Sequence, residues 1–532
     1  MQESEKKYSK FSIWILGLKE KIEKNTGVLF VFTLLVFWLG IFLAQPVNLV
    51  DTDLGRHIEN GRYFFTEHKI PDTNLYSYTN PDVPFINHHW GSGLLFFLIW
   101  KIAGLSGLSF FYVALSLLTF SILFFQVKKI AGLALATFST VLVIPLIGER
   151  TEVRPEVFSY FFATIFFLLL WKFKKDELKK RALFLLPILS LIWINLHIYF
   201  IFGIGIVGLF LLDTIIEKNW QKFKVLFLVL ILSIGVSFAN PFGIKAVLYP
   251  LNIFRNYGYR VLENQSVGFL TNLGFINNPN LLIFKIVLAI LLASIILIFT
   301  LDRKKINWPL FGLSLTVSVL GWSALRNFAL FGYFAMPAIA CNLKYGLKKK
   351  VDLNDGWSKI IIFSLSASFF LFFSYLFQGK LLRENNVGLT EQAQNASAEF
   401  FKENKLAGPI FNNYDIGGYL IFHLYPREKV FVDNRPEAYP NAFFTDAYVP
   451  MQEDESVWQR MLSQYNFNAI YFSIHDATNW GQEFLVKRIK DSEWAPVFAD
   501  GYAIIFLRRN EKNRDLISRF KMSQDYFSVT TQ

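Results

Sequence analysis

The chain has 532 residues, of which 53% are hydrophobic and only 18% are charged. A soluble domain typically carries about 25% charged residues, and a soluble interior could not hide this much apolar surface. The single cysteine excludes a disulfide-stapled fold, and the many large apolar side chains exclude a disordered chain. Composition therefore predicts a polytopic membrane protein.

The net charge of +12 would raise nucleic-acid binding in a soluble protein. Here the basic surplus lies in short loops between apolar segments, where the positive-inside rule places it on the cytoplasmic side. We therefore expect no nucleic-acid partner.

Twelve apolar segments predict an all-α polytopic membrane bundle of about 11–12 segments. They are 27–45, 91–103, 106–126, 130–147, 156–171, 182–196, 198–216, 223–239, 281–301, 307–325, 328–343 and 358–378. A perpendicular span needs about 20 residues, so the short 91–103 run is the candidate for an incomplete crossing. Eleven crossings then fit the distribution of basic loops best.

The domain organisation follows from the same pattern. Residues 1–26 are rich in lysine and precede an apolar run without a cleavage site, which predicts a cytoplasmic N-terminal segment. Residues 27–379 form the transmembrane module, with a long external loop at 46–90. Residues 380–532 predict an external soluble α/β domain, and the protein is expected in the plasma (inner) membrane.

The C-terminal region alternates short strands and helices, which is typical of a small α/β domain. The expected strands are 409–412, 429–433, 469–473, 496–500 and 502–507. The expected helices lie near 391–403, 455–465 and 481–491.

The first external loop carries the most chemistry. Asp51 and Asp53 directly follow the first span, Arg56 and His57 come next, and His88, His89 and Trp90 end the loop. Residues 53–66 are amphipathic and predict a helix lying in the membrane interface. Charges also belong at any membrane boundary, but a loop this long tends to be functional.

The second external loop, Gly148–Glu156, places three carboxylates beside Arg150 and Arg154. The side chains could neutralise one another in surface ion pairs. Alternatively, Glu152 and Glu156 could face Asp53 and bind a divalent cation, Mg²⁺ or Mn²⁺, through oxygen ligands.

Further polar residues lie near membrane depth, where a functional role is the default. His197 follows the 182–196 segment and Arg326 ends the 307–325 segment. Each could be an interface anchor or an interhelical hydrogen-bond partner. Together they could line an external cavity for an anionic lipid headgroup.

At these residues the chain resembles the GT-C superfamily of membrane glycosyltransferases, which use polyprenyl-phosphate-linked sugars. The likeness is carried by a D-x-D-x-x-x-H-x-x-x-G-R loop and a following H-x-W element. In this sequence they are Asp51, Asp53, His57, Gly61 and Arg62, then His88 and Trp90. Members carry an essential acidic residue after the first span and a second acidic motif in the next external loop, usually with Asp, where this chain has only Glu.

The resemblance implies an inverting glycosyltransferase acting on the outer face of the membrane. Asp53 or Asp51 would be the general base, and the divalent cation, if bound, would be held by Asp53, Glu152 and Glu156. The polyprenyl phosphate of the donor would be bound by basic side chains: His57, His88, His89, Arg150, Arg154, His197 and Arg326. The sugar and the acceptor (glycan, lipid or protein) stay open. A transporter or lipid flippase is the alternative, and a non-catalytic scaffold the third.

The segment Asn412–Arg435 is similar in outline to the W-W-D-Y-G segment of oligosaccharyltransferases. Asn413 and Tyr414 stand where both tryptophans would be, so peptide recognition is not carried over. Helix packing through Gly417 and Gly418 explains those two glycines equally well.

Overall fold

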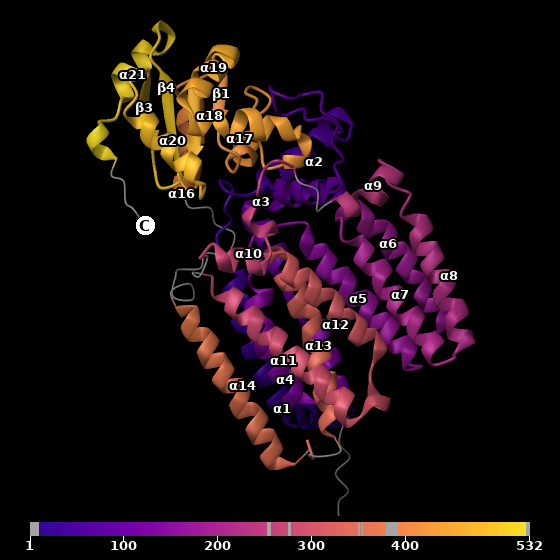
Figure 1. The fold of residues 1–532 in the computed structure, drawn as a ribbon. Helices are drawn as coiled ribbons and strands as arrows, with labels where there is room; N and C mark the ends of the chain where they lie inside the picture. Colours follow the sequence, from indigo (N-terminus) through magenta and orange to yellow (C-terminus); the bar gives the residue numbers. More distant parts are fainter. Residues whose placement is uncertain are drawn as a thin grey trace, which may run out of the picture. The chain divides into compact units, whose positions relative to one another are not determined.

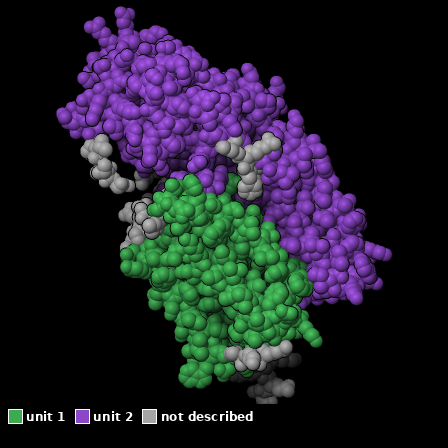
Figure 2. All heavy atoms as spheres, viewed as in Figure 1, with its two compact units in different colours: residues 1–43, 117–150, 266–383 green, residues 44–116, 151–265, 384–532 purple. Residues whose placement is uncertain are grey.

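The computed structural model describes residues 10–252, 257–274, 278–348, 352–353, 355–378 and 392–527 (Figure 1). The chain forms two compact units, each assembled from separate stretches of sequence (Figure 2). Unit 1 contains residues 1–43, 117–150 and 266–383. Unit 2 contains residues 44–116, 151–265 and 384–532.

Unit 1 is a bundle around one central helix, α13 (Phe328–Leu347), which packs against α4 (Leu133–Ile147), α11 (Pro279–Leu301) and α12 (Trp308–Ser323). Most of α13 is buried, as expected of a helix that is apolar on every side. The unit also contains α1 (Lys10–Leu43), α10 (Val267–Asn272) and α14 (Gly356–Leu376). Large apolar side chains on the outer helices are exposed, which suits a surface that faces lipid.

The helical part of unit 2 is built around α7 (Phe200–Ile216), which packs on α5 (Glu156–Lys174) and α8 (Trp220–Val236). Its other helices are α2 (Leu54–Glu67), α6 (Leu185–Leu196) and α9 (Ile244–Leu248). Helix α3 (Trp90–Ala131) runs from unit 2 into unit 1 and is interrupted at Gly104, whose φ of 64° breaks the helical path. That interruption separates the expected segments 91–103 and 106–126.

All twelve apolar segments expected from the sequence are helical, so the expected bundle is confirmed. Among the described residues, five helices are long and apolar enough to cross a membrane. They are Thr26–Leu43 within α1, then α3, α5, α11 and α14. The protein is a membrane protein. The cytoplasmic N-terminus, the external C-terminus and the count of eleven crossings stay predictions.

The C-terminal region folds as a four-stranded sheet in the order β1-β2-β4-β3. Strands β1 (Ile410–Asn412) and β2 (Ala469–Ser473) are parallel, while β3 (Trp494–Ala499) and β4 (Ala503–Arg508) complete the sheet with antiparallel pairs. The helices of this region are α16 (Gln392–Glu403), α17 (Gly417–Leu424), α18 (Pro450–Glu453), α19 (Glu455–Tyr465), α20 (Asn479–Ile489) and α21 (Arg514–Phe520). The expected C-terminal α/β fold is therefore confirmed.

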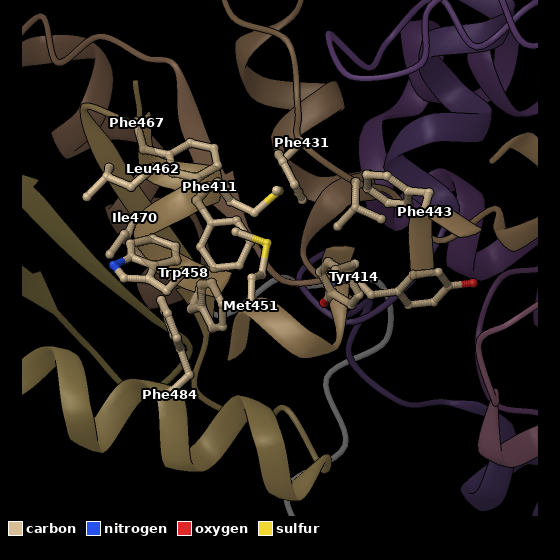
Figure 3. Packing of buried hydrophobic residues seen from close by; sticks show 14 of the residues in the cluster. Phe411, Tyr414, Phe431, Phe443, Met451, Trp458, Leu462, Phe467, Ile470 and Phe484 are labelled. Carbon is tan, nitrogen blue, oxygen red and sulfur yellow. The ribbon is translucent and has the colours of Figure 1, made fainter. Parts of the chain in front are cut away.

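Aromatic side chains fill the core of this domain (Figure 3). Phe411 of β1 lies 5.2 Å from Trp458, 5.4 Å from Phe467 and 5.3 Å from Phe484, measured between ring centroids. All four side chains are buried. Such rings contribute both area burial and edge-to-face attraction, so the sheet and helices α19 and α20 share one packed core.

The expected strand at 429–433 is not part of the sheet, and this expectation was wrong. Val430 instead exchanges backbone hydrogen bonds with the first loop, donating to Tyr76 and accepting from Tyr78. The side chain of Asn412 satisfies the next backbone groups, accepting from Phe431 N and donating to Val432 O. The first loop and the C-terminal region thus belong to one compact unit.

Candidate active site

The site begins where the chain leaves the first span. The side chain of Asn48 accepts hydrogen bonds from the backbone of Val50 (2.8 Å) and Asp51 (3.2 Å), which makes a tight turn. Helix α2 then begins after Asp53, whose carbonyl accepts from His57 N at 3.1 Å. The carboxylate of Asp53 makes no capping bond to the helix backbone, so it is available to other groups near the positive end of the helix.

Three basic side chains surround the Asp53 carboxylate. Oδ2 accepts from Arg56 Nη2 at 3.1 Å and from His57 Nε2 at 3.2 Å, while Arg154 Nε lies 4.0 Å from Oδ1. Burial disfavours the charged form, but the hydrogen bond from His57 and the charges of Arg154 and Arg56 outweigh it and hold the pKa of Asp53 well below its usual range. Asp53 is therefore an ionised carboxylate, with 21% of its side chain exposed, and its buried Oδ1 accepts no hydrogen bond from the described residues.

His57 is a neutral imidazole that orients the Asp53 carboxylate. The side chain is buried, and burial lowers its pKa despite the attraction of Asp53. A neutral ring that bonds a carboxylate must carry its proton on that nitrogen, so Nε2–H donates to Asp53 and Nδ1 is left as an acceptor. Nδ1 has no hydrogen-bond partner among the described residues.

The other expected histidines extend from His57 as a row of rings. His57 and His89 are 5.4 Å apart between ring centroids, and His89 stacks on His197 at 5.0 Å with only 8° between the planes. His88 is 3.9 Å from His89. Burial, reinforced by the neighbouring imidazoles, holds the pKa of His89 well below its usual range. The structure therefore brings all four histidines together.

The far end of the row is anchored inside the bundle. Trp193 Nε1 donates to Ser159 Oγ at 2.7 Å, and Ser159 lies 2.7 Å from His197 Nδ1. Because His197 Nδ1 also accepts from the backbone N–H of Tyr199 at 3.4 Å, it carries no proton, and the serine hydroxyl donates to it. Helices α5 and α6 thereby fix the orientation of the row.

The second loop meets the first through a guanidinium. Arg154 Nε donates to Glu152 Oε2 at 2.6 Å, and Nη1 donates to both oxygens of Glu263 at 2.8 and 3.0 Å. Arg154 also faces Asp53, so three carboxylates from three loops share one arginine. Glu263 was not anticipated; the only signal was an acidic residue in the long 239–280 loop.

The described residues form no group of three or more His, Cys, Asp or Glu that could hold a metal ion. Glu152 is held by Arg154, and Glu156 is buried in the first turn of α5. The carboxylates of Asp53, Glu152 and Glu156 thus do not fit a divalent cation. Asp53, Glu152 and Glu263 instead form a cluster of carboxylates around the Arg154 guanidinium.

Asp51 has partners of a different kind. Its Oδ1 accepts from Ser473 Oγ at 2.7 Å, and its Oδ2 lies 3.0 Å from His475 Nδ1 and 3.1 Å from Asn48 Nδ2. Ser473 is the last residue of strand β2 and His475 follows it, and nothing in the local sequence pattern indicated either residue. Arg150 and Arg326, also expected at the site, belong to unit 1, where Arg326 lies in the short 3₁₀ turn Leu325–Asn327.

No protein-family model and no curated protein matches the sequence. Solved structures do match. The archaeal oligosaccharyltransferase AglB from Archaeoglobus fulgidus, in complex with an inhibitory peptide and a dolichol-phosphate, superposes with a TM-score of 0.62 at 11% identity, over 92% of this chain and 75% of that one. The chain has the GT-C fold.

Two further GT-C structures support this. Apo ArnT from Cupriavidus metallidurans gives a TM-score of 0.53 at 14% identity, over 91% of this chain and 98% of that one. The arabinofuranosyltransferase AftD from Mycobacteria gives 0.53 at 13% identity, over 92% of this chain and 40% of that one. At sequence identities of 11–14% these comparisons show a shared fold, and it is the fold that the sequence resemblance implied.

Proposed function

We propose that this protein is an integral membrane glycosyltransferase that transfers a sugar from a polyprenyl-phosphate donor to an acceptor on the outer face of the membrane. The GT-C fold supports the class of reaction, and the AglB structure was solved with a dolichol-phosphate. The observation that carries the proposal is the Asp53 carboxylate, ionised, partly exposed and flanked by guanidinium groups.

In the proposed reaction Asp53 is the general base. The acceptor oxygen or nitrogen forms a bond to the anomeric carbon while the bond from that carbon to the phosphate oxygen breaks, which inverts the configuration. The acceptor proton passes to Asp53, and the electron pair of the broken bond leaves with the polyprenyl phosphate. A carboxylate with a low pKa can accept this proton because the acceptor becomes acidic as the new bond forms.

The leaving phosphate needs positive charge at the point where its own charge develops. Arg154 is best placed, since it already lies against Asp53, and Arg56 is the next cation. His57 and His89 are held neutral, so they would act on the donor as hydrogen-bonding groups only. Binding of the phosphate by His88, Arg150, His197 and Arg326 stays part of the proposal. The proposed reaction contains no step through a metal ion.

The decisive experiment replaces Asp53 by Asn in the full-length protein in nanodiscs. The probes are synthetic short-chain polyprenyl phosphates of mannose, glucose and arabinose, with an envelope extract as acceptor source, and the readout is release of polyprenyl phosphate. Loss of the base should lower the rate by at least about 10²–10⁴-fold. Asp72→Asn, an exposed residue of the same loop, is the matched control. Full activity of Asp53→Asn would remove Asp53 from the mechanism.

A further inference from the structure

The C-terminal region contacts the segment around Asp53 at three separate points. The first is Asp51, both of whose carboxylate oxygens are occupied by hydrogen-bond donors. Ser473 donates to Oδ1 (2.7 Å), and His475 Nδ1 donates to Oδ2 (3.0 Å). Ser473 ends strand β2 and is fully buried, so its position is set by the sheet.

These residues do not form a nucleophile–histidine–acid relay. In such a relay the serine bonds the histidine ring, which in turn bonds the carboxylate. Here the hydroxyl of Ser473 donates to the carboxylate itself, and its oxygen accepts from the backbone N–H of His475 at 3.2 Å. Asp51 is therefore placed as an acceptor that ties the first loop to β2.

The second point is a close approach of two backbones, α17 and α2. A Cβ added at Gly418 would lie 2.7 Å from Thr52 O and 3.4 Å from Asp53 Cα. A Cβ added at Gly55 would lie 2.6 Å from Gly418 O. Only glycine allows this approach, and the atoms that it touches belong to Asp53 and its neighbours.

The third point is Asn434, whose Oδ1 accepts from Arg56 Nε at 3.5 Å, while Arg56 in turn bonds Asp53. Asn434 stands between Asp433 and Arg435, a fully buried ion pair with two hydrogen bonds of 2.7 and 2.6 Å. Arg435 Nη2 also donates to Asn74 Oδ1 in the first loop at 2.6 Å. The backbone that carries Asn434 is thus fixed to the first loop.

We propose that the C-terminal region positions the general base: Gly418, Ser473 and His475 hold segment 51–56 so that the Asp53 carboxylate keeps its orientation, and Asp51 is part of this support. This inference rests on the proposed function. It assigns different roles to the two aspartates that the sequence left equivalent. Asp53 has guanidinium neighbours and an oxygen, Oδ1, that accepts no hydrogen bond from the described residues, whereas both oxygens of Asp51 accept hydrogen bonds from the C-terminal region.

The kinetic test uses the full-length protein in nanodiscs with the donor probes named above. A side chain at Gly418 must displace the segment that carries Asp53, and a misplacement of about 1 Å costs roughly 10²-fold. Gly418→Val should therefore lower kcat about 10- to 100-fold with the donor KM unchanged. Gly501→Ala is the matched control, because a Cβ at Gly501 meets nothing within 4 Å. Wild-type kcat in Gly418→Val would overturn the proposal.

Conservative variants separate support from chemistry. Asp51→Asn keeps an oxygen that accepts from Ser473, so it should retain activity within about 10-fold of wild type, whereas Asp51→Leu should behave like Gly418→Val. Asp51→Asn as inactive as Asp53→Asn would make Asp51 a reacting group and overturn the assignment. If Gly418→Val does not reach the membrane, Ser473→Ala, which removes one hydroxyl, provides the same test.

Hydrogen–deuterium exchange separates this inference from the proposed function. Amides 52–58 should exchange faster in Gly418→Val and Ser473→Ala than in wild type and Gly501→Ala. If wild type releases no polyprenyl phosphate from any probe, the proposed function fails while the exchange pattern still tests the contacts. If transfer is intact and depends on Asp53, but exchange and kcat are unchanged in these variants, the positioning role alone is refuted.

Discussion

Arg154→Gln is the substitution with the clearest electrostatic consequence. Two unit charges 4.0 Å apart, the separation of Arg154 Nε and Asp53 Oδ1, attract by about 4 kcal/mol at an effective dielectric of 20. Both side chains are about one-fifth exposed (18% and 21%), so water reduces this figure. Gln also removes the positive charge that Glu152 and Glu263 share with Asp53, and the repulsion between these carboxylates acts in the same direction.

The sign of the effect follows from which form Arg154 stabilises. Arg154 favours ionised Asp53, so its removal raises the pKa of Asp53, and activity that needs the base form is lost at a higher pH on acidification. One pKa unit corresponds to about 1.36 kcal/mol, so even a third of the interaction would move the acid limb by about one pH unit. Because the pKa of Asp53 is lower in the folded protein than in the unfolded chain, ionised Asp53 stabilises the fold at pH values above its unfolded pKa. That stability is lost as the pH falls through the folded pKa of Asp53.

The assay is the pH profile of kcat/KM for release of polyprenyl phosphate by wild type, Arg154→Gln and Arg154→Lys. The acid limb should move to higher pH in Arg154→Gln and stay close to wild type in Arg154→Lys, which keeps the charge. Identical acid limbs in wild type and Arg154→Gln would show that Arg154 does not govern the base. A lower plateau in Arg154→Gln would add evidence that the guanidinium also binds the leaving phosphate.

Two further predictions concern the packing of α2 at Gly61 and the dependence of transfer on a metal ion. Gly61→Ala would place a methyl group 2.3 Å from Gly93 O and 2.5 Å from Phe97 Cβ, so it should lower the free energy of unfolding by about 1–3 kcal/mol, measured by thermal melting in detergent. Gly40→Ala is the control and should melt as wild type does, because a Cβ at Gly40 meets nothing within 4 Å. Excess chelator should leave transfer unchanged, because the described carboxylates and imidazoles form no metal-binding group; activity that is lost and then restored by Mg²⁺ or Mn²⁺ would contradict this.

The membrane helices could be predicted because their signal is local: a run of apolar residues of sufficient length specifies a helix wherever it lies. The place of segment 429–433, which was expected to be a strand of the sheet, could not be predicted from such a local signal. Its composition suits a strand, but its backbone partners are Tyr76 and Tyr78, some 350 residues earlier, and the side chain of Asn412. Local pattern shows that a segment is extended and leaves its partner undetermined.

Helix α2 shows the same limit. Its amphipathic pattern predicted a helix, and residues Leu54–Glu67 form one. Its place in the membrane interface stays a prediction, but Leu54 to Gly61 are all buried and the helix packs on α17, which the amphipathic pattern did not indicate. The available signal was the glycine pair Gly55 and Gly61, because glycines within a helix permit another backbone to approach closely.

The motif search placed Asp51 and Asp53 together because it reads spacing along one loop. It could not rank them, since their difference lies in side chains from β2 for one and from the second loop for the other. Of the second-loop carboxylates that were expected to face Asp53, Glu152 shares Arg154 with it. A cluster of Glu and Arg within eight residues is compatible with either arrangement, and only the fold selects the guanidinium as the common partner. That selection matters for the proposed reaction, in which a guanidinium shared by three carboxylates would both keep Asp53 ionised and offer its charge to the leaving phosphate.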